Sequence, residues 1–117
     1  MMDLQELKQH FVRDNVARRL GNLASTLHRL ADFIEIRRPT DSVIALIDEA
    51  ARFAEWTRDD VDPERAGLLD ELLEDLVHWR TLISAEGSLS DASIEVEGRA
   101  RDWTNRIIDV SGLSAEV

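Results

Sequence analysis

Hydrophobic residues recur every three or four positions along most of this chain, and this spacing predicts helices. Between Val16 and Ile34 they occupy positions 16, 20, 23, 27, 30 and 34. Because 3.6 residues complete a turn of α-helix, these side chains fall on a single stripe. Later segments repeat the spacing, and no segment between them shows the alternation typical of a β-strand. The sequence therefore predicts an all-α protein.

A break in the first helical stretch is expected near Asp14. The hydrophobic stripe that begins at Leu4 does not continue in phase into the next stripe, and Asp14 and Asn15 are both favourable N-cap residues. We therefore expect a short helix at about 3–13 that is kinked from the first core helix at about 15–36.

Two prolines mark the boundaries of the next helices. Pro39 disfavours helical geometry at the residue before it, so the first core helix is expected to end there, and Thr40 or Asp41 is expected to cap the second. Asp62 and Pro63 suit the N-cap and the first position of the third core helix, because that position needs no N–H donor. The remaining helices are predicted at about 41–57, 63–84 and 90–111.

The connections between these helices are short, which favours antiparallel neighbours. A chain of 117 residues is long enough to bury one hydrophobic core, so we expect a single domain over residues 1–117. The predicted architecture is an up-down-up-down antiparallel four-helix bundle, with the short extra helix at its N-terminal end.

The predicted helix at 63–84 carries more hydrophobic residues than one core-facing stripe needs. It is therefore either central in the bundle or partly covered by a second subunit, and a homodimer is one of these two explanations. Four of its side chains form a candidate interaction surface: Leu68, Leu73, Val77 and Trp79.

The composition of the chain limits the cellular compartment and the kinds of covalent or metal site that we expect. The chain has no cysteine, which excludes disulfides and thiolate metal sites. Its charged N-terminal residues do not resemble a signal peptide, and no run approaches the ~18 apolar residues that a membrane span needs. We expect a cytoplasmic protein without a membrane-spanning segment.

The chain is strongly acidic, with a net charge of −10. Residues 1–38 hold seven basic and five acidic residues, whereas residues 39–117 hold seven basic and 19 acidic ones. Phosphate backbones and anionic lipids repel such a chain, so nucleic-acid and membrane-surface partners are not expected. The same charge supports a different interpretation, an acidic decoy whose carboxylates imitate nucleic-acid phosphates for a basic DNA-binding protein.

One acidic segment matches a calcium loop in part. Four carboxylates stand at positions 1, 3, 5 and 12 of the loop count, but Arg65 occupies the position that requires glycine. The four are Asp60, Asp62, Glu64 and Glu71. A helix cap explains Asp62 better than a calcium site does.

Two further segments match other metal motifs in part. The run Asp70-Glu71-Leu72-Leu73-Glu74 resembles the first half of the metal motif of all-helical nucleotide pyrophosphohydrolases, but the Glu-x-x-Asp that follows in that family is missing. Asp75-x-x-His78 resembles one ligand pair of a di-iron bundle, which needs two such pairs and two more glutamates. The sequence therefore predicts no metal, no cofactor and no catalytic residue.

His28 is the candidate phosphoacceptor. An acidic four-helix chain of this length with a histidine beside its hydrophobic stripe resembles a histidine phosphotransfer domain, and Arg29 stands next to it to pair with a phosphate. Ala31 and Asp32 occupy the positions where such domains carry lysine and glycine. An ordinary helical histidine is the alternative interpretation.

Several strings resemble a family of small, uncharacterised all-helical cyanobacterial proteins. They are Arg19-Leu20-Gly21-Asn22-Leu23-Ala24-Ser25, Glu55-Trp56-Thr57, Trp103 and Ser111-Gly112-Leu113. The resemblance covers nearly the whole chain. It implies a bacterial cytoplasmic protein and assigns no activity, cofactor or catalytic residue.

The predicted function is a non-enzymatic protein–protein interaction or regulatory module with an unknown protein partner. It rests on the excess hydrophobic surface and on the incomplete state of every catalytic motif. Two alternatives stay open: a histidine phosphotransfer-like domain that uses His28, and the acidic nucleic-acid-mimic decoy.

Overall fold

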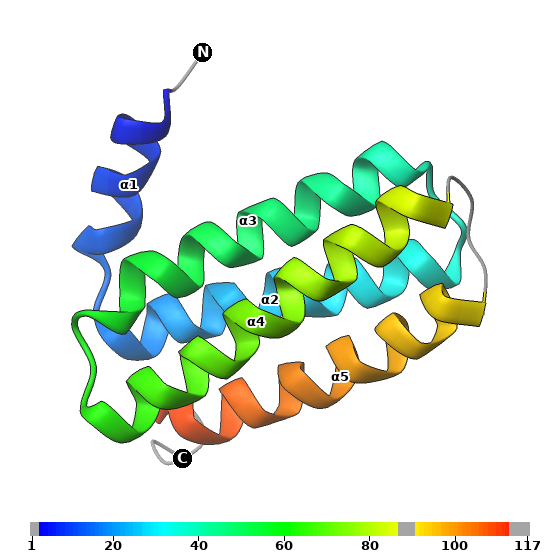
Figure 1. Ribbon diagram of the computed structural model, residues 1–117. Helices are drawn as coiled ribbons and strands as arrows, with labels where there is room; N and C mark the ends of the chain where they lie inside the picture. Colours follow the sequence, from blue (N-terminus) through cyan, green and yellow to red (C-terminus); the bar gives the residue numbers. More distant parts are fainter. Residues whose placement is uncertain (1–2, 87–90, 113–117) are drawn as a thin grey trace.

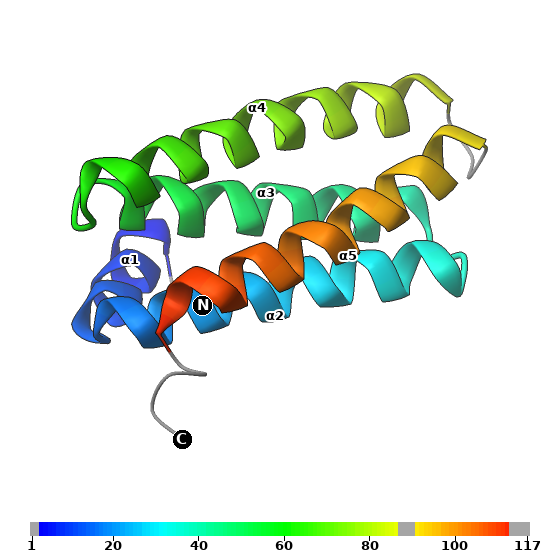
Figure 2. The ribbon, with the colours of Figure 1, turned by 90° about the horizontal axis from the view of Figure 1, so that it is seen from below.

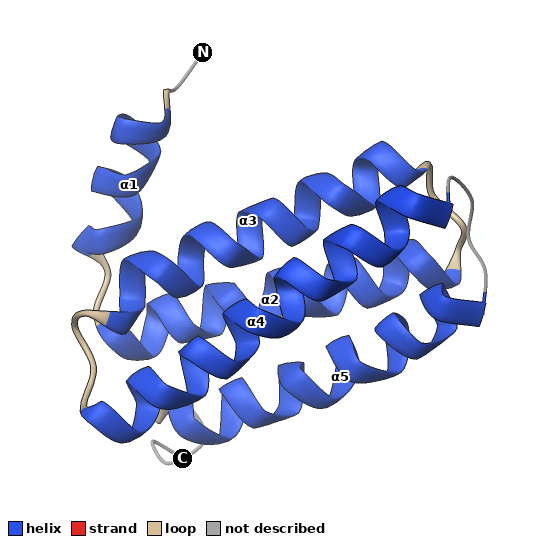
Figure 3. Ribbon diagram, in the orientation of Figure 1, coloured by secondary structure: helices blue, strands red, loops and turns tan. Residues whose placement is uncertain are grey.

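The computed structural model describes residues 3–86 and 91–112, and within them it contains five helices and no strand (Figure 3). The predicted all-α class is confirmed for this part of the chain. The helices end within two residues of the positions expected from the sequence. They are α1 (Leu4–Arg13), α2 (Val16–Glu35), α3 (Thr40–Arg58), α4 (Pro63–Glu86) and α5 (Asp91–Ser111).

The four longer helices lie side by side, and α1 projects from one end of them (Figure 1). Successive long helices run in opposite directions, as the view from below also shows (Figure 2). α2 packs against α3 and α5, and α4 packs against the same two helices. The hydrophobic core therefore lies between α2, α3, α4 and α5.

The stripe that predicted the first core helix forms one wall of this core. Five of its six residues are at most 4% exposed, and Val16 packs against their edge. The five are Leu20, Leu23, Leu27, Leu30 and Ile34. Removing these side chains from water is the main contribution that stabilises the helix against the rest of the protein.

The spacing between neighbouring helices depends on the size of the side chains between them. α2 and α5 have the most extensive contact, and they contribute the small residues Ala24, Ala31 and Ala100, which are fully or almost fully buried. α4 and α5 have the least extensive contact of the four neighbouring pairs, and they contribute the buried indoles of Trp79 and Trp103. Small residues allow two helix backbones to approach closely, whereas large rings hold them apart.

One aromatic cluster attaches α1 to the other helices. The Phe11 ring stacks on Phe53 of α3 with 4.3 Å between ring centroids and lies 5.8 Å from the ring of Trp56. Phe11 is 5% exposed, whereas Leu4 at the far end of the same helix is 59% exposed. α1 is therefore an arm that is attached at its C-terminal end.

The junction between α1 and α2 is held by capping and by a buried arginine. Asn15 caps α2, since its side-chain oxygen accepts from the Arg18 N–H at 2.8 Å. Arg19, only 6% exposed, donates to the Asp14 carbonyl at 3.1 Å and to the Trp56 carbonyl at 3.3 Å. It also forms an ion pair of 2.8 Å with Asp60. The break predicted near Asp14 is confirmed. The contacts of Arg19 connect the junction between α1 and α2 to the C-terminal end of α3.

One predicted cap is wrong and another is confirmed. The N-cap of α3 is Pro39, without a side-chain hydrogen bond, so neither Thr40 nor Asp41 has this role. The Pro39 carbonyl accepts from the N–H of Val43, which starts the helix at Thr40. Asp62 does cap α4, because its carboxylate accepts from the Arg65 N–H at 3.1 Å.

The end of α2 is a Schellman motif with an arginine where glycine is usual. The Arg38 N–H donates to the Phe33 carbonyl at 2.9 Å, and the Arg37 N–H donates to the Ile34 carbonyl at 3.1 Å. Arg37 accordingly has φ of 58°, in the left-handed region. The end of α5 uses glycine instead, since Gly112 has φ of +87°; Leu113 lies outside the described residues.

Replacing Arg37 with glycine is expected to raise the free energy of unfolding by about 0.5 kcal/mol. The left-handed conformation costs a non-glycine residue roughly 1–2 kcal/mol, and the greater freedom of glycine in the unfolded chain offsets part of that gain. Urea denaturation measures the change. Arg37→Ala is the control, because it removes the charge but keeps the Cβ atom, and an equal gain in this variant would contradict the conformational explanation.

Candidate functional site

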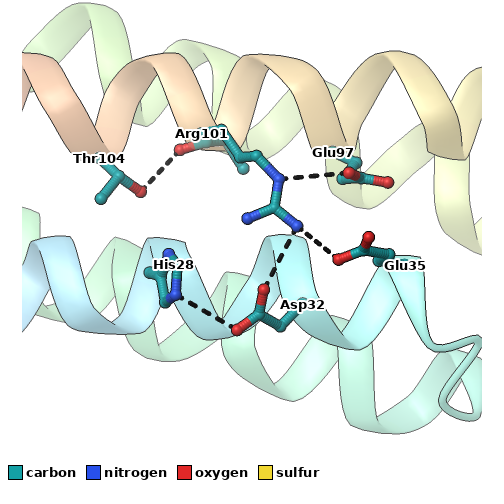
Figure 4. Close-up of polar contacts among 7 residues, drawn as sticks. His28, Asp32, Glu35, Glu97, Arg101 and Thr104 are labelled. Carbon is teal, nitrogen blue, oxygen red and sulfur yellow. Dashed lines mark hydrogen bonds and ion pairs between the residues drawn. The ribbon is translucent and has the colours of Figure 1, made fainter.

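His28 lies on the outer face of α2, near α5. Its side chain is 57% exposed, and its Nε2 atom lies 3.3 Å from the Asp32 carboxylate one turn further along the helix (Figure 4). This exposure agrees with the place of His28 beside the hydrophobic stripe. The Nε2 atom of His28, however, lies next to the negatively charged carboxylate of Asp32.

Arg101 of α5 reaches across to the same region of α2. Its guanidinium contacts Asp32 at 3.2 Å, Glu35 at 2.9 Å and Glu97 of its own helix at 3.2 Å (Figure 4). Burial lowers the pKa of Arg101, but the hydrogen bonds that it donates to Glu97 and Asp32 outweigh this effect and raise the pKa above its usual value. This cluster of one arginine and three carboxylates fastens α5 to the end of α2.

A groove between α2 and α5 begins beside His28. It has a volume of about 460 Å³, and small side chains of both helices line it, together with the half-exposed Ile108. Thr104, on its α5 side, donates its hydroxyl to the Ala100 carbonyl at 2.8 Å (Figure 4). His28 is therefore one of the residues that line this groove.

The surroundings of His28 differ from those that the phosphotransfer hypothesis requires. Arg29, the expected phosphate partner, forms an ion pair of 2.9 Å with Glu49 of α3. Glu49 also accepts the hydroxyl of Thr26 at 2.8 Å. A phosphoryl group on His28 would meet the carboxylate of Asp32 and would have to draw Arg29 away from Glu49.

The carboxylates of the calcium-like segment point to separate partners. Asp60 pairs with Arg19, Asp62 caps α4 and pairs with Arg65, and Glu71 contacts Arg106 at 3.3 Å. Within the described residues, no group of three or more histidine, aspartate and glutamate side chains is arranged to hold a metal ion. The arrangement of these carboxylates supports helix capping and helix-to-helix ion pairs.

The candidate interaction surface on α4 is divided between core and solvent. Leu68 and Leu73 are partly buried against the core, and Trp79 is 1% exposed, so Trp79 is not a surface residue as expected. Val77 alone of the four is strongly exposed, at 68%. The excess hydrophobic character of this helix is largely explained by its contacts with both α3 and α5.

Sequence reasoning missed the arginines that connect the helices. Arg58 of α3 holds Asp70 of α4 in a two-pronged contact of 2.6 and 2.8 Å, and Arg80 of α4 contacts Asp48 of α3 at 2.9 Å. Such pairs join residues far apart in the chain, so their spacing follows no helical period. The abundance of arginine is the one sequence feature from which such a network could have been expected.

Asp70 is expected to make the stability of the protein depend on pH under acidic conditions. The hydrogen bond from Arg58 lowers the pKa of the Asp70 carboxyl below its ordinary value of 3.8, so the folded state binds a proton less readily than the unfolded state. The stabilisation is complete at neutral pH and is lost as the pH falls from about 5 through the lowered pKa. Asp70→Asn should therefore destabilise the protein at neutral pH and converge with the wild type in acid.

Urea denaturation at a series of pH values tests this expectation. Glu74→Gln changes an exposed carboxylate on the same helix and serves as the control. A constant difference between the wild type and Asp70→Asn at all pH values would mean that the pair with Arg58 does not carry the effect.

Comparison of the chain with protein-family models, curated proteins and solved structures finds no match. The resemblance to small cyanobacterial helical proteins therefore stays a prediction from the sequence. None of the helices in the described residues is both long enough and apolar enough to span a bilayer. The described residues form an all-helical fold in which arginine–carboxylate pairs connect neighbouring helices.

Proposed function

We propose that this chain is a non-enzymatic protein-interaction module, built as an up-down-up-down four-helix bundle with α1 as an added arm. The bundle architecture is supported by the antiparallel directions of α2, α3, α4 and α5 and by the packing of each against two neighbours (Figures 1 and 2).

The observation that carries the proposal is the uncovered half of α1. The stripe of this helix begins with Leu4 and Leu7 and ends with Phe11, but only Phe11 is buried. α1 projects from one end of the four long helices and has only a small contact with α3 (Figure 1). Near its N-terminal end Leu4 is 59% exposed and Leu7 is only partly buried. An amphipathic helix with a free hydrophobic face is a common recognition element, since a partner helix or groove buries that face on binding.

A second copy of the chain is the partner that the arm fits best. If two arms overlap in an antiparallel way over residues 3–8, Leu4 of each faces Leu7 of the other, and Asp3 of each faces Lys8 of the other. Phe11 keeps its contact with Phe53 in this arrangement. Because the shared surface is short, we expect a dimer that dissociates on dilution.

Leu4→Asp is expected to shift the protein to the monomer. The substitution places a charge in the proposed contact, whereas Leu4 is already 59% exposed within one chain and contributes little to its fold. Sedimentation velocity or light scattering over a range of concentrations measures the molar mass. The expected result is a concentration-dependent dimer for the wild type and a monomer for the variant.

Val77→Asp is the matched control, because Val77 is also strongly exposed, at 68%, but lies on α4. It should associate as the wild type does. A wild type that stays monomeric at high concentration would contradict the proposal, and so would equal effects of the two substitutions.

The two alternative functions have less support. Phosphotransfer through His28 is opposed by the neighbouring Asp32 carboxylate and by the engagement of Arg29 with Glu49. The acidic decoy requires free carboxylates gathered on one surface, yet many carboxylates are paired with arginines at several different helix boundaries.

A further inference from the structure

The turn between α2 and α3 presents one hydrophobic side chain and two arginines to solvent. Ile36 is 59% exposed, and Arg37 and Arg38 are both exposed. We call these three residues the basic turn. It lies at the end of the four long helices that is opposite to α1 (Figure 1). A partner at the basic turn and a second copy at the arm would therefore contact different ends of the molecule.

The two arginines of the basic turn differ from most others in the protein, because no carboxylate binds them. Arginines at every boundary between neighbouring long helices pair with carboxylates. In contrast, neither Arg37 nor Arg38 forms an ion pair in the described part of the chain. Glu35 contacts Arg101 at 2.9 Å instead, and Asp41 lies in the first turn of α3, where the helix dipole favours a negative charge. The basic turn thus keeps two positive charges available in a chain whose net charge is −10.

Arg37 keeps its place in this turn at a cost in stability. Its φ of 58° lies in the left-handed region, where glycine is the favourable residue. The dipole of α2 favours a positive charge near its C-terminal end, but Arg38 already provides one. An unfavourable backbone conformation is often retained at a binding site.

Arg38 is held beside the end of α2 by an aromatic ring. Its guanidinium carbon lies over the ring of Phe33, 5.4 Å from the centroid. This contact restricts the side chain but uses the face of the guanidinium, so the N–H donors of Arg38 remain available to a carboxylate.

We infer that the basic turn binds a short acidic segment of a partner protein. A carboxylate accepts two N–H groups from one guanidinium side by side, so aspartate or glutamate side chains suit Arg37 and Arg38. A hydrophobic side chain of the same segment would cover Ile36. The acidic remainder of this chain repels any polyanion that extends beyond the turn, which favours a short protein segment over a nucleic acid or an anionic membrane.

Fluorescence anisotropy with a short labelled peptide, in which aspartates flank a leucine, tests this inference. The wild type should bind this peptide but not one with asparagine in place of aspartate, and rising salt should weaken the binding. Arg37→Gly should weaken it about fivefold, because one exposed ion pair is lost. The same substitution is expected to stabilise the protein, so weaker binding cannot result from unfolding. Arg38→Ala should weaken binding to a similar extent.

Two controls locate the contact. Arg18→Ala removes an arginine that is 71% exposed at the other end of α2, and this variant should bind the peptide as the wild type does. Leu4→Asp should also bind it normally, so a failure of the proposed dimer and a failure of the acidic-segment site give different results. The inference is overturned if the acidic peptide does not bind, if Arg37→Gly and Arg38→Ala bind it normally, or if Arg18→Ala weakens binding as much as they do.

The other possible occupants of the basic turn have their own measurements. Phosphatidylserine vesicles or a DNA duplex that bind through Arg37 and Arg38 more tightly than the peptide would overturn the inference. A loss of self-association in Arg37→Gly would assign the turn to a second copy of the chain and would overturn it as well.

Discussion

Replacing Leu76 with alanine is expected to lower the free energy of unfolding by about 3 kcal/mol, the largest effect that we predict for one substitution. Leu76 is 1% exposed and lies on the face of α4 that packs against the core. Truncation loses the transfer free energy of the removed carbons and leaves a cavity that the surrounding helices fill only in part. Urea denaturation monitored by circular dichroism gives the value.

The next residue along the chain provides the control. Val77 is 68% exposed, so Val77→Ala is expected to change the free energy of unfolding by no more than about 0.5 kcal/mol. Both residues are hydrophobic and adjacent in the helix. Comparable effects of the two substitutions would show that α4 is rotated relative to the orientation described above.

Arg19→Ala is expected to destabilise the protein by about 2–3 kcal/mol. The guanidinium donates to the Asp14 and Trp56 carbonyls, and without it these acceptors lose their partner at the place where α1, α2 and α3 meet. The ion pair with Asp60 contributes less, because Asp60 is 53% exposed and water screens the interaction. Urea denaturation measures the loss.

Arg18→Ala is the matched control for Arg19→Ala. Arg18 is the preceding residue, its side chain is 71% exposed, and it contacts Asp14 at 3.8 Å. Its removal should cost no more than about 0.5 kcal/mol. Arg19→Lys keeps the charge but loses the forked geometry of the guanidinium. Its loss in the free energy of unfolding should lie between those of Arg19→Ala and Arg18→Ala. If Arg19→Ala proves as mild as Arg18→Ala, the three hydrogen bonds do not hold the junction.

The helix ends show where local sequence rules succeed and where they fail. The break at Asp14 and the caps Asn15 and Asp62 were predictable, because a capping side chain bonds to a backbone N–H three residues away. The start of α3 was misjudged, because the Pro39 carbonyl rather than a polar side chain satisfies the first N–H groups. The left-handed Arg37 was equally hidden, since arginine has no preference for that conformation.

The candidate site around His28 was only partly predictable, because some of its contacts join residues far apart in the chain. The exposure of His28 followed from its place beside the stripe of α2. Its interaction with Asp32 is local, but the contact of Asp32 with Arg101 joins residues 69 positions apart.

The sequence by itself determined the helices, their ends to within two residues and the side of α2 that is buried, because these follow from a period of 3.6 residues and from contacts within one turn. The tertiary structure decided which hydrophobic residues of α4 reach solvent, which arginine pairs with which carboxylate, and how far α5 stands from α4. These properties depend on the rotation and spacing of helices that are distant in the chain, and side-chain size at each boundary sets both.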